Sequence, residues 1–216
     1  MRIYTISGLG ADERVFSNLD TGHELIHLPW LPPLSDESLA AYAKRLSQKI
    51  DTSQAFSLLG VSFGGIVAVE MEKILNPERV ILISSAQIKS DLNPIFRFIG
   101  KTGILKNLPL SVFRPQPKYV ARLFDVQDKY KELLFEILKD SDDHFTKWAM
   151  HSISTWQNEH QSHRVMMIHG TKDKVLNCPK RAEVIKIHGA GHGMIMNRSN
   201  EINELIRKIY HNDTKE

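Results

Sequence analysis

The stretch Gly60-Val61-Ser62-Phe63-Gly64-Gly65 places a serine between glycines, after an apolar run and before residues that can continue as a helix. A G-x-S-x-G motif between a strand and a helix is a nucleophile elbow, a strained turn that exposes the serine hydroxyl. Glycines suit this turn because a side chain at Gly60 or Gly64 would collide where the strand and the helix cross. The amide of Phe63 would stand at the helix N-terminus, where it can donate to an oxyanion. On its own, the motif also fits a glycine-rich turn whose serine caps a helix.

Two further residues with catalytic side chains follow predicted strands later in the chain. Asp173 ends the stretch His169-Gly170-Thr171-Lys172-Asp173, and His192 ends Gly189-Ala190-Gly191-His192. A histidine can remove the proton of a serine near neutral pH, and a carboxylate fixes the tautomer of that histidine. Parallel strands present their C-terminal ends at one edge of a sheet, where ligands bind. We therefore predict a triad of Ser62 as nucleophile, His192 as base and Asp173 as acid.

Other acidic residues compete with Asp173 for the third position. Asp91 follows the preceding predicted strand, six residues beyond Ser85, but it lies in a polar stretch without a comparable turn pattern. Asp142 and Asp143 are interpreted as charges in the first turn of a helix, where they interact favourably with its dipole. Asp173 is therefore preferred as the acid.

The elements that must position these residues are six predicted strands separated by helices. Apolar and β-branched runs predict strands at 1–7, 24–28, 55–59, 79–84, 164–168 and 183–187. Ser35 is expected to cap a helix with Leu39, Tyr42 and Leu46 on one face. Alternating strands and helices predict an α/β fold with a mostly parallel sheet covered on both faces.

The chain changes character after Ser85. Residues 86–162 contain helical patterns and no convincing strand, which predicts a helical cap inserted into a core of 1–85 and 163–216. Phe145 and Trp148 lie on one helical face of this insertion. Together with Trp30, which follows the second strand, they are predicted to line a substrate pocket, although packing on the core is the alternative.

In these motifs the chain resembles the α/β-hydrolase superfamily, especially its small capped esterases, over nearly its whole length. The residues around Ser62, Asp173 and His192 are similar to the family's elbow, acid turn and histidine loop. The resemblance implies that Ser7-Gly8-Leu9-Gly10 is the oxyanion loop, with the amide of Leu9 as the second donor beside Phe63. Two departures are a serine at position 7, where the family usually has histidine, and a start at what would be the family's third strand.

The resemblance implies hydrolysis of a carboxylic ester through an acyl-enzyme intermediate. The predicted cap at 86–162 would enclose an apolar pocket above the serine, which predicts a short to medium acyl group. The same triad also serves thioesterases, acyltransferases and lyases, and fold alone does not choose among them. A ligand receptor without enzymatic activity is the alternative of another class. No cofactor is expected, and His160 and His163 lack the partners of a zinc site.

Composition narrows the class of protein. The 216 residues, 42% hydrophobic and 25% charged, are typical of one globular domain with an insertion. The formal charge of +3, from 28 basic and 25 acidic residues, is too balanced to favour nucleic acid. No signal peptide and no apolar run near the ~20 residues of a membrane helix is found, so we expect no membrane partner. The single Cys178 excludes an intrachain disulfide and favours a cytoplasmic location, whereas the sequence does not determine the oligomeric state.

Overall fold

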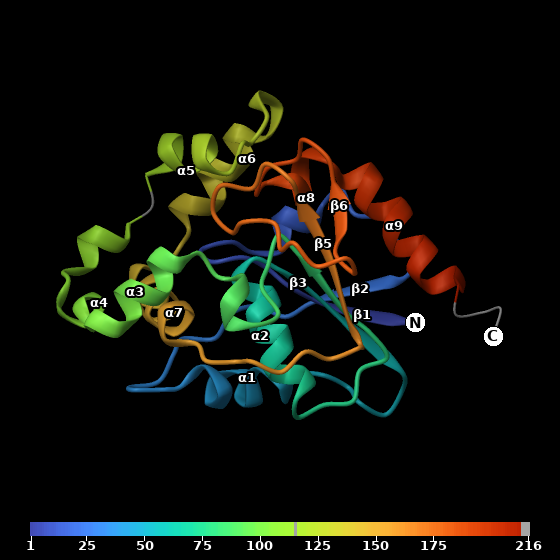
Figure 1. Cartoon of the computed structure of the whole chain (residues 1–216), viewed down its shortest axis with the longest axis horizontal. Helices are drawn as coiled ribbons and strands as arrows, with labels where there is room; N and C mark the ends of the chain where they lie inside the picture. Colours follow the sequence, from blue (N-terminus) through green and yellow to red (C-terminus); the bar gives the residue numbers. More distant parts are fainter. Residues whose placement is uncertain (115, 213–216) are drawn as a thin grey trace.

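The computed structural model describes residues 1–114 and 116–212 of the chain. Its sheet has six strands in the order β2-β1-β3-β4-β5-β6, and every neighbouring pair is parallel. The strands are β1 (Arg2–Ile6), β2 (Glu24–His27), β3 (Phe56–Val61), β4 (Val80–Ile83), β5 (Val165–Gly170) and β6 (Ile185–Ile187). The predicted α/β architecture is therefore confirmed, with a sheet that is parallel throughout (Figure 1).

The central strands are buried on both faces, which explains their nearly continuous apolar sequences. Successive residues of β3 and β4 point to opposite sides, so Leu58 and Leu82 join one core and Leu59 and Ile83 join the other. Helices α1 (Leu39–Ser47) and α2 (Phe63–Glu72) cover the first core. The second core is covered by the short helices η1 (Glu13–Phe16) and α8 (Met194–Asn197) and by α9 (Ser199–Asn212).

Helix α1 begins later than the sequence predicts. Ser38, not Ser35, is its N-cap, and the Ser38 hydroxyl accepts a hydrogen bond from the Ala41 N–H at 3.2 Å. Asp36 has a φ of 53°. This left-handed conformation interrupts the backbone between the two serines, so the helix cannot start at the first of them.

Between β4 and β5 the described residues form helices and loops and no strand. The helices are η2 (Lys89–Asp91), α3 (Pro94–Thr102), α4 (Ile104–Asn107), η3 (Leu110–Phe113), α5 (Pro117–Leu123), α6 (Asp128–Lys139) and α7 (Asp143–Thr155). Pro115, which falls within the predicted insertion, lies outside the described residues. We call 86–162 the helical segment; in Figure 1, α3 to α7 lie opposite the end of the sheet where β1 begins. The division of the chain into core and cap stays a prediction.

None of the described helices is both long enough and apolar enough to cross a bilayer.

Candidate active site

The turn between β3 and α2 holds Ser62 in a strained conformation. Its φ is 51°, a left-handed value that serine rarely adopts. Two glycines make this turn possible. A Cβ on Gly60 would overlap the backbone of Gly64 and Gly65, and a Cβ on Gly64 would overlap the carbonyl oxygen of Ile6 at the end of β1. The elbow therefore brings the serine to the C-terminal edge of the sheet, next to β1.

Three side chains from the ends of different strands meet at this edge. The Ser62 Oγ lies 2.9 Å from the His192 Nε2, and the His192 Nδ1 lies 2.7 Å from the Asp173 Oδ2. His192 and Asp173 are buried, whereas Ser62 is partly exposed. With its Nδ1 proton directed at the carboxylate, a neutral His192 has the lone pair of Nε2 free to accept the serine proton. The structure thus assembles a continuous chain from hydroxyl to imidazole to carboxylate.

Asp173 is held as a carboxylate by its surroundings. Burial opposes ionisation, but hydrogen bonds from His169, His192 and the backbone outweigh it and keep the pKa of Asp173 below its ordinary value. The Oδ1 atom accepts the N–H groups of Val175 at 2.8 Å and Leu176 at 3.0 Å. These bonds fix the plane of the carboxylate, so that Oδ2 faces the imidazole of His192.

His169 is a neighbour of Asp173 whose role no motif in the sequence predicts. Its ring is fully buried on β5, and its Nε2 lies 2.9 Å from the Leu176 carbonyl oxygen and 3.3 Å from the Asp173 Oδ2. An N–H shared between these acceptors places a second imidazole on the oxygen that binds His192. The position immediately before Gly170, at the end of a strand, was the only signal in the sequence.

We expect replacement of His169 to slow turnover through Asp173. In His169→Phe the ring is kept and the N–H is lost; because a hydrogen bond to a charged group is worth about 1.5–3 kcal/mol, kcat should fall roughly 10–100-fold with little change in KM. His169→Gln, which keeps a donor, should recover part of the loss. Steady-state kinetics of both variants, with thermal melting as a check of folding, make the test. Equal losses in both variants would assign His169 to packing alone.

The predicted oxyanion donors lie on either side of the serine. Phe63 is the first residue of α2, and a Cβ on Gly8, which precedes Leu9, would lie 3.5 Å from the Ser62 Cβ. Among the described residues, no backbone acceptor pairs with the N–H of Leu9 or of Phe63. Both amides are therefore available to a ligand oxygen placed beside the hydroxyl.

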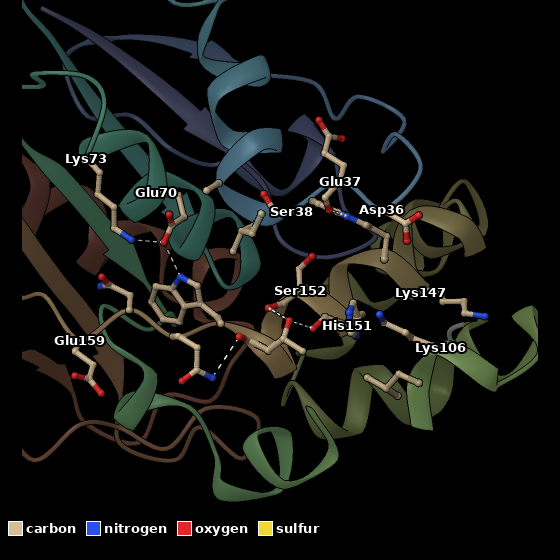
Figure 2. Close-up of a pocket in the computed structure, with 18 of the residues that line it drawn as sticks. Asp36, Glu37, Ser38, Glu70, Lys73, Lys106, Lys147, His151, Ser152 and Glu159 are labelled. Carbon is tan, nitrogen blue, oxygen red and sulfur yellow. Dashed lines mark hydrogen bonds and ion pairs between the residues drawn. The ribbon is translucent and has the colours of Figure 1, made fainter. Parts of the chain in front are cut away.

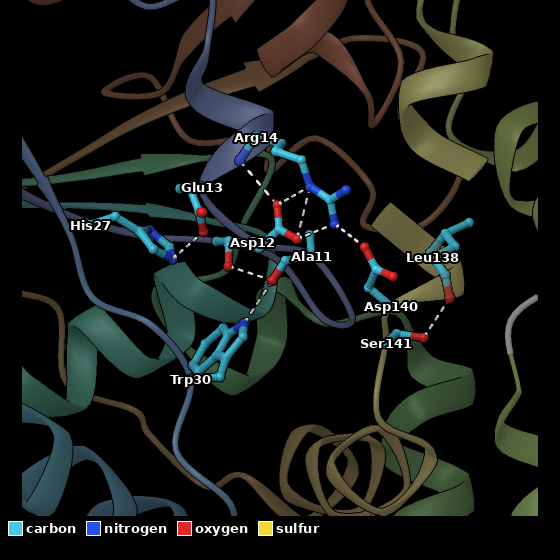
Figure 3. A network of polar contacts seen from close by, with 10 residues as sticks. Ala11, Asp12, Glu13, Arg14, His27, Trp30, Leu138, Asp140 and Ser141 are labelled. Carbon is cyan, nitrogen blue, oxygen red and sulfur yellow. Dashed lines mark hydrogen bonds and ion pairs between the residues drawn. The ribbon is translucent and has the colours of Figure 1, made fainter. Parts of the chain in front are cut away.

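Serine at position 7 stabilises the loop 7–11 that contains Leu9. The buried Ser7 hydroxyl donates to the Ala11 carbonyl oxygen at 2.7 Å, and the same oxygen accepts the Trp30 indole N–H at 3.0 Å. Figure 3 shows the latter bond and, beside it, Arg14 joining Asp12 to Asp140 of the helical segment. The Ser7 hydroxyl and the Trp30 indole therefore both hold the Ala11 carbonyl oxygen and fix the loop.

The other candidate acids lie elsewhere. Asp91 accepts the N–H groups of Gln87 at 3.0 Å and Ile88 at 3.2 Å, and its Oδ2 lies 2.9 Å from an Arg181 nitrogen. Asp142 is the N-cap of α7, and Asp143 lies in its first turn. Asp173 forms the hydrogen bond with His192, and none of these three carboxylates does.

The helical segment contacts the site at its histidine. The Phe124 ring lies edge-on to the His192 ring, 4.6 Å between centroids, and the Phe124 carbonyl oxygen accepts the Gly193 N–H at 2.7 Å. Asn197 of α8 donates to the Asp125 carbonyl oxygen at 2.6 Å. No pattern in the sequence indicated this contact, because it joins residues about 70 positions apart.

The predicted pocket residues Trp30, Phe145 and Trp148 pack against one another and do not line a common cavity at Ser62. Trp30 stacks on Phe63 at 5.6 Å and lies 4.9 Å from Phe145, and Trp148 lies 4.4 Å from Tyr42. Trp30 and Phe145 line a hollow of about 240 Å³. Trp148 lines a different hollow of about 1010 Å³, which is the one drawn in Figure 2. Ser62 lines neither of them, so the structure favours the packing alternative for these aromatic side chains.

Within the described residues, no group of three or more acidic, cysteine or histidine side chains could hold a metal ion.

Comparisons with known proteins find similarity in structure and none in sequence. No family model matches the chain, and no curated protein matches it. A thermophilic esterase from Thermogutta terrifontis superposes with a TM-score of 0.71 at 14% identity, over 98% of this chain and 90% of its own. An esterase from Exiguobacterium antarcticum gives 0.71 at 14% identity, over 97% and 91%. The MenH protein of S. aureus gives 0.71 at 16% identity, over 99% and 94%. Likeness at such identities shows a shared fold.

Proposed function

We propose that this chain, which has the α/β-hydrolase fold, is a serine hydrolase that cleaves carboxylic esters. One observation carries the proposal: the Ser62, His192 and Asp173 side chains form one hydrogen-bonded chain beside two unpaired amides. A nucleophile, a base, an orienting acid and an oxyanion site are the parts that acyl transfer requires. The names of the superposed esterases support the same class of reaction.

The reaction proceeds in two halves. His192 Nε2 takes the proton as the Ser62 Oγ attacks the ester carbonyl carbon, and the amides of Leu9 and Phe63 bind the resulting oxyanion. The imidazolium then protonates the leaving alkoxide, which departs as an alcohol and leaves an acyl group on the serine. Water, deprotonated by His192, attacks this acyl group, and the carboxylic acid is released as the serine regains its proton.

Other reactions begin with the same attack. A thioester leaves a thiol in place of the alcohol, an acyltransferase replaces water with another nucleophile, and lyases reuse the same triad. A receptor that binds a ligand without turning it over is the remaining alternative. Labelling of Ser62 by a fluorophosphonate, together with turnover of simple esters, supports the hydrolase. Absence of both in folded protein contradicts it.

We expect short to medium p-nitrophenyl esters to be preferred over emulsified long-chain lipid. Helices of the helical segment lie against the histidine loop. An apolar pocket discriminates acyl chains by size, and each methylene changes the free energy of transition-state binding by about 1–3 kcal/mol or less. The measurement is kcat/KM across the ester series, for wild type and Trp148→Ala. Because Trp148 packs on Tyr42 and Phe63 and its indole donates to the Glu37 carbonyl oxygen, the variant should lose stability.

Trp148→Phe, which keeps a ring, is the control for this packing. A Trp148→Ala variant that gains activity toward longer acyl groups, while Trp148→Phe does not, would place the side chain beside the acyl group. Best activity on emulsified long-chain lipid would contradict the size preference.

A further inference from the structure

Part of the helical segment carries charge of one sign. From Pro94 to Phe124 the sequence has six basic residues and no acidic one: Arg97, Lys101, Lys106, Arg114, Lys118 and Arg122. The remainder of the chain has 22 basic against 25 acidic residues. A chain with a modest overall charge of +3 therefore concentrates its positive charge in one stretch of 31 residues.

The same stretch carries most of the large apolar side chains that face solvent. Eight such side chains are exposed among the described residues, and five of them lie here: Ile95, Phe98, Ile104, Val112 and Tyr119. Phe98 and Ile95 are 69% and 64% exposed. A cluster of exposed apolar groups in one segment marks an interaction surface more often than scattered single residues do.

Helix α3 exposes Ile95 and Phe98 to solvent, while Phe96 of the same helix packs against the core. Its Gly100 faces α7, since a Cβ there would overlap the Ser154 carbonyl oxygen. At the roughly 100° per residue of an α-helix, Ile95 and Phe98 lie about 140–160° around the helix from Gly100, and Lys101 lies about 60° from Phe98. No residue of α3 is buried, although the helix is strongly amphipathic.

We propose that the described residues of this stretch, 94–114 and 116–124, bind the surface of an anionic lipid bilayer. Apolar side chains on a helix that enter the headgroup region, bordered by lysine and arginine near lipid phosphates, are the features of interfacial helices. A second copy of the chain bound to this stretch would bring like charges together. An acidic peptide would leave Phe98 and Ile95 without an apolar partner. The expectation of no membrane partner rested on the lack of a spanning run, which such binding does not need.

Two variants on α3 and two matched controls test the proposal. Phe98→Gln removes an exposed ring and Lys101→Glu reverses a charge. Leu34→Gln changes a side chain that is 60% exposed in another loop, and Lys208→Glu reverses an exposed charge on α9. The full chain is sedimented with vesicles of phosphatidylcholine, with and without about one quarter phosphatidylglycerol, and circular dichroism checks that each variant is folded.

The wild type should sediment with phosphatidylglycerol vesicles and remain in solution with phosphatidylcholine alone. Phe98→Gln and Lys101→Glu should each weaken binding at least about tenfold, the two controls less than about twofold, and ~0.5 M NaCl should weaken wild-type binding strongly. Ser62→Ala should bind like the wild type, since binding is independent of hydrolysis.

Four results would overturn the proposal. The first is no binding to anionic vesicles, and the second is equal loss of binding in the controls. The third is a dimer in size-exclusion chromatography that the two α3 variants abolish, which would assign the face to a second copy. The fourth is binding to polyglutamate as tight as to vesicles and unaffected by Phe98→Gln, which would assign it to an acidic polymer.

Discussion

Replacement of Ser62 by alanine should reduce ester hydrolysis by about 10⁵-fold or more in kcat, as loss of a triad serine does in other hydrolases. The hydroxyl is the group that bonds to the acyl carbon, so no other atom of the site can replace it. The fold should be retained, because the Ser62 side chain makes no capping bond to α2, and within the described part of the chain its only polar contact is the His192 ring. Residual activity would come from the two oxyanion amides and from binding.

The measurements are single-turnover kinetics with p-nitrophenyl acetate and mass spectrometry after fluorophosphonate treatment. The wild type should gain one phosphonate, on Ser62, and Ser62→Ala should gain none. Ser111→Ala, which changes an exposed serine in η3, should keep both activity and labelling. Near-normal turnover by Ser62→Ala would refute the assignment of the nucleophile.

Replacement of Asp173 by asparagine should lower kcat by up to about 10⁴-fold. An amide in this position no longer stabilises the imidazolium of His192, and its NH₂ group can select the wrong tautomer of the ring. Asp91→Asn is the matched control, because Asp91 is the nearest competing acid and its carboxylate is also largely buried. Asp91→Asn should alter stability through Arg181 and the backbone of 87–88 but leave turnover per folded molecule unchanged. A larger loss in Asp91→Asn would reverse the assignment.

The pH dependence of stability offers a second test for Asp173. Because the pKa of this carboxyl is lower in the folded state, its contribution to stability is complete above the unfolded value of about 3.9 and disappears as the pH falls through the folded value. Asparagine does not titrate. The difference in the free energy of unfolding between wild type and Asp173→Asn should therefore shrink below about pH 4, as measured by urea denaturation at a series of pH values. A constant difference would contradict the carboxylate's lowered pKa.

The parts of the fold that depend on local pattern were predictable. Both cores draw on alternate residues of β3 and β4, so these strands appear in the sequence as unbroken apolar runs. The elbow could also be predicted from the sequence, since only glycine fits at positions 60 and 64. Parallel strands then made it possible to expect Ser62, Asp173 and His192 at one edge without any knowledge of distances.

Contacts between distant segments were not predictable in the same way. The bond from His169 to Asp173 depends on the path of the loop after β5. The contact of Phe124 with His192 depends on how the end of α5 meets the loop before α8. The aromatic side chains Trp30, Phe145 and Trp148 illustrate a different limit. Helical spacing shows that two of them share a face, but it does not tell whether that face meets a substrate or the ring of Phe63.

The hydrogen bond from the Gly193 N–H to the Phe124 carbonyl oxygen has a consequence for transplanting parts between proteins of this architecture. A designer who exchanges the helices between β4 and β5 for those of another protein would also remove the acceptor of Gly193 and the partners of Asn197. Those groups neighbour His192, so the graft would weaken the positioning of this histidine as well as replace the helices. The natural junction of such a chimera therefore lies on the N-terminal side of Phe124, with 124–127 kept from the recipient.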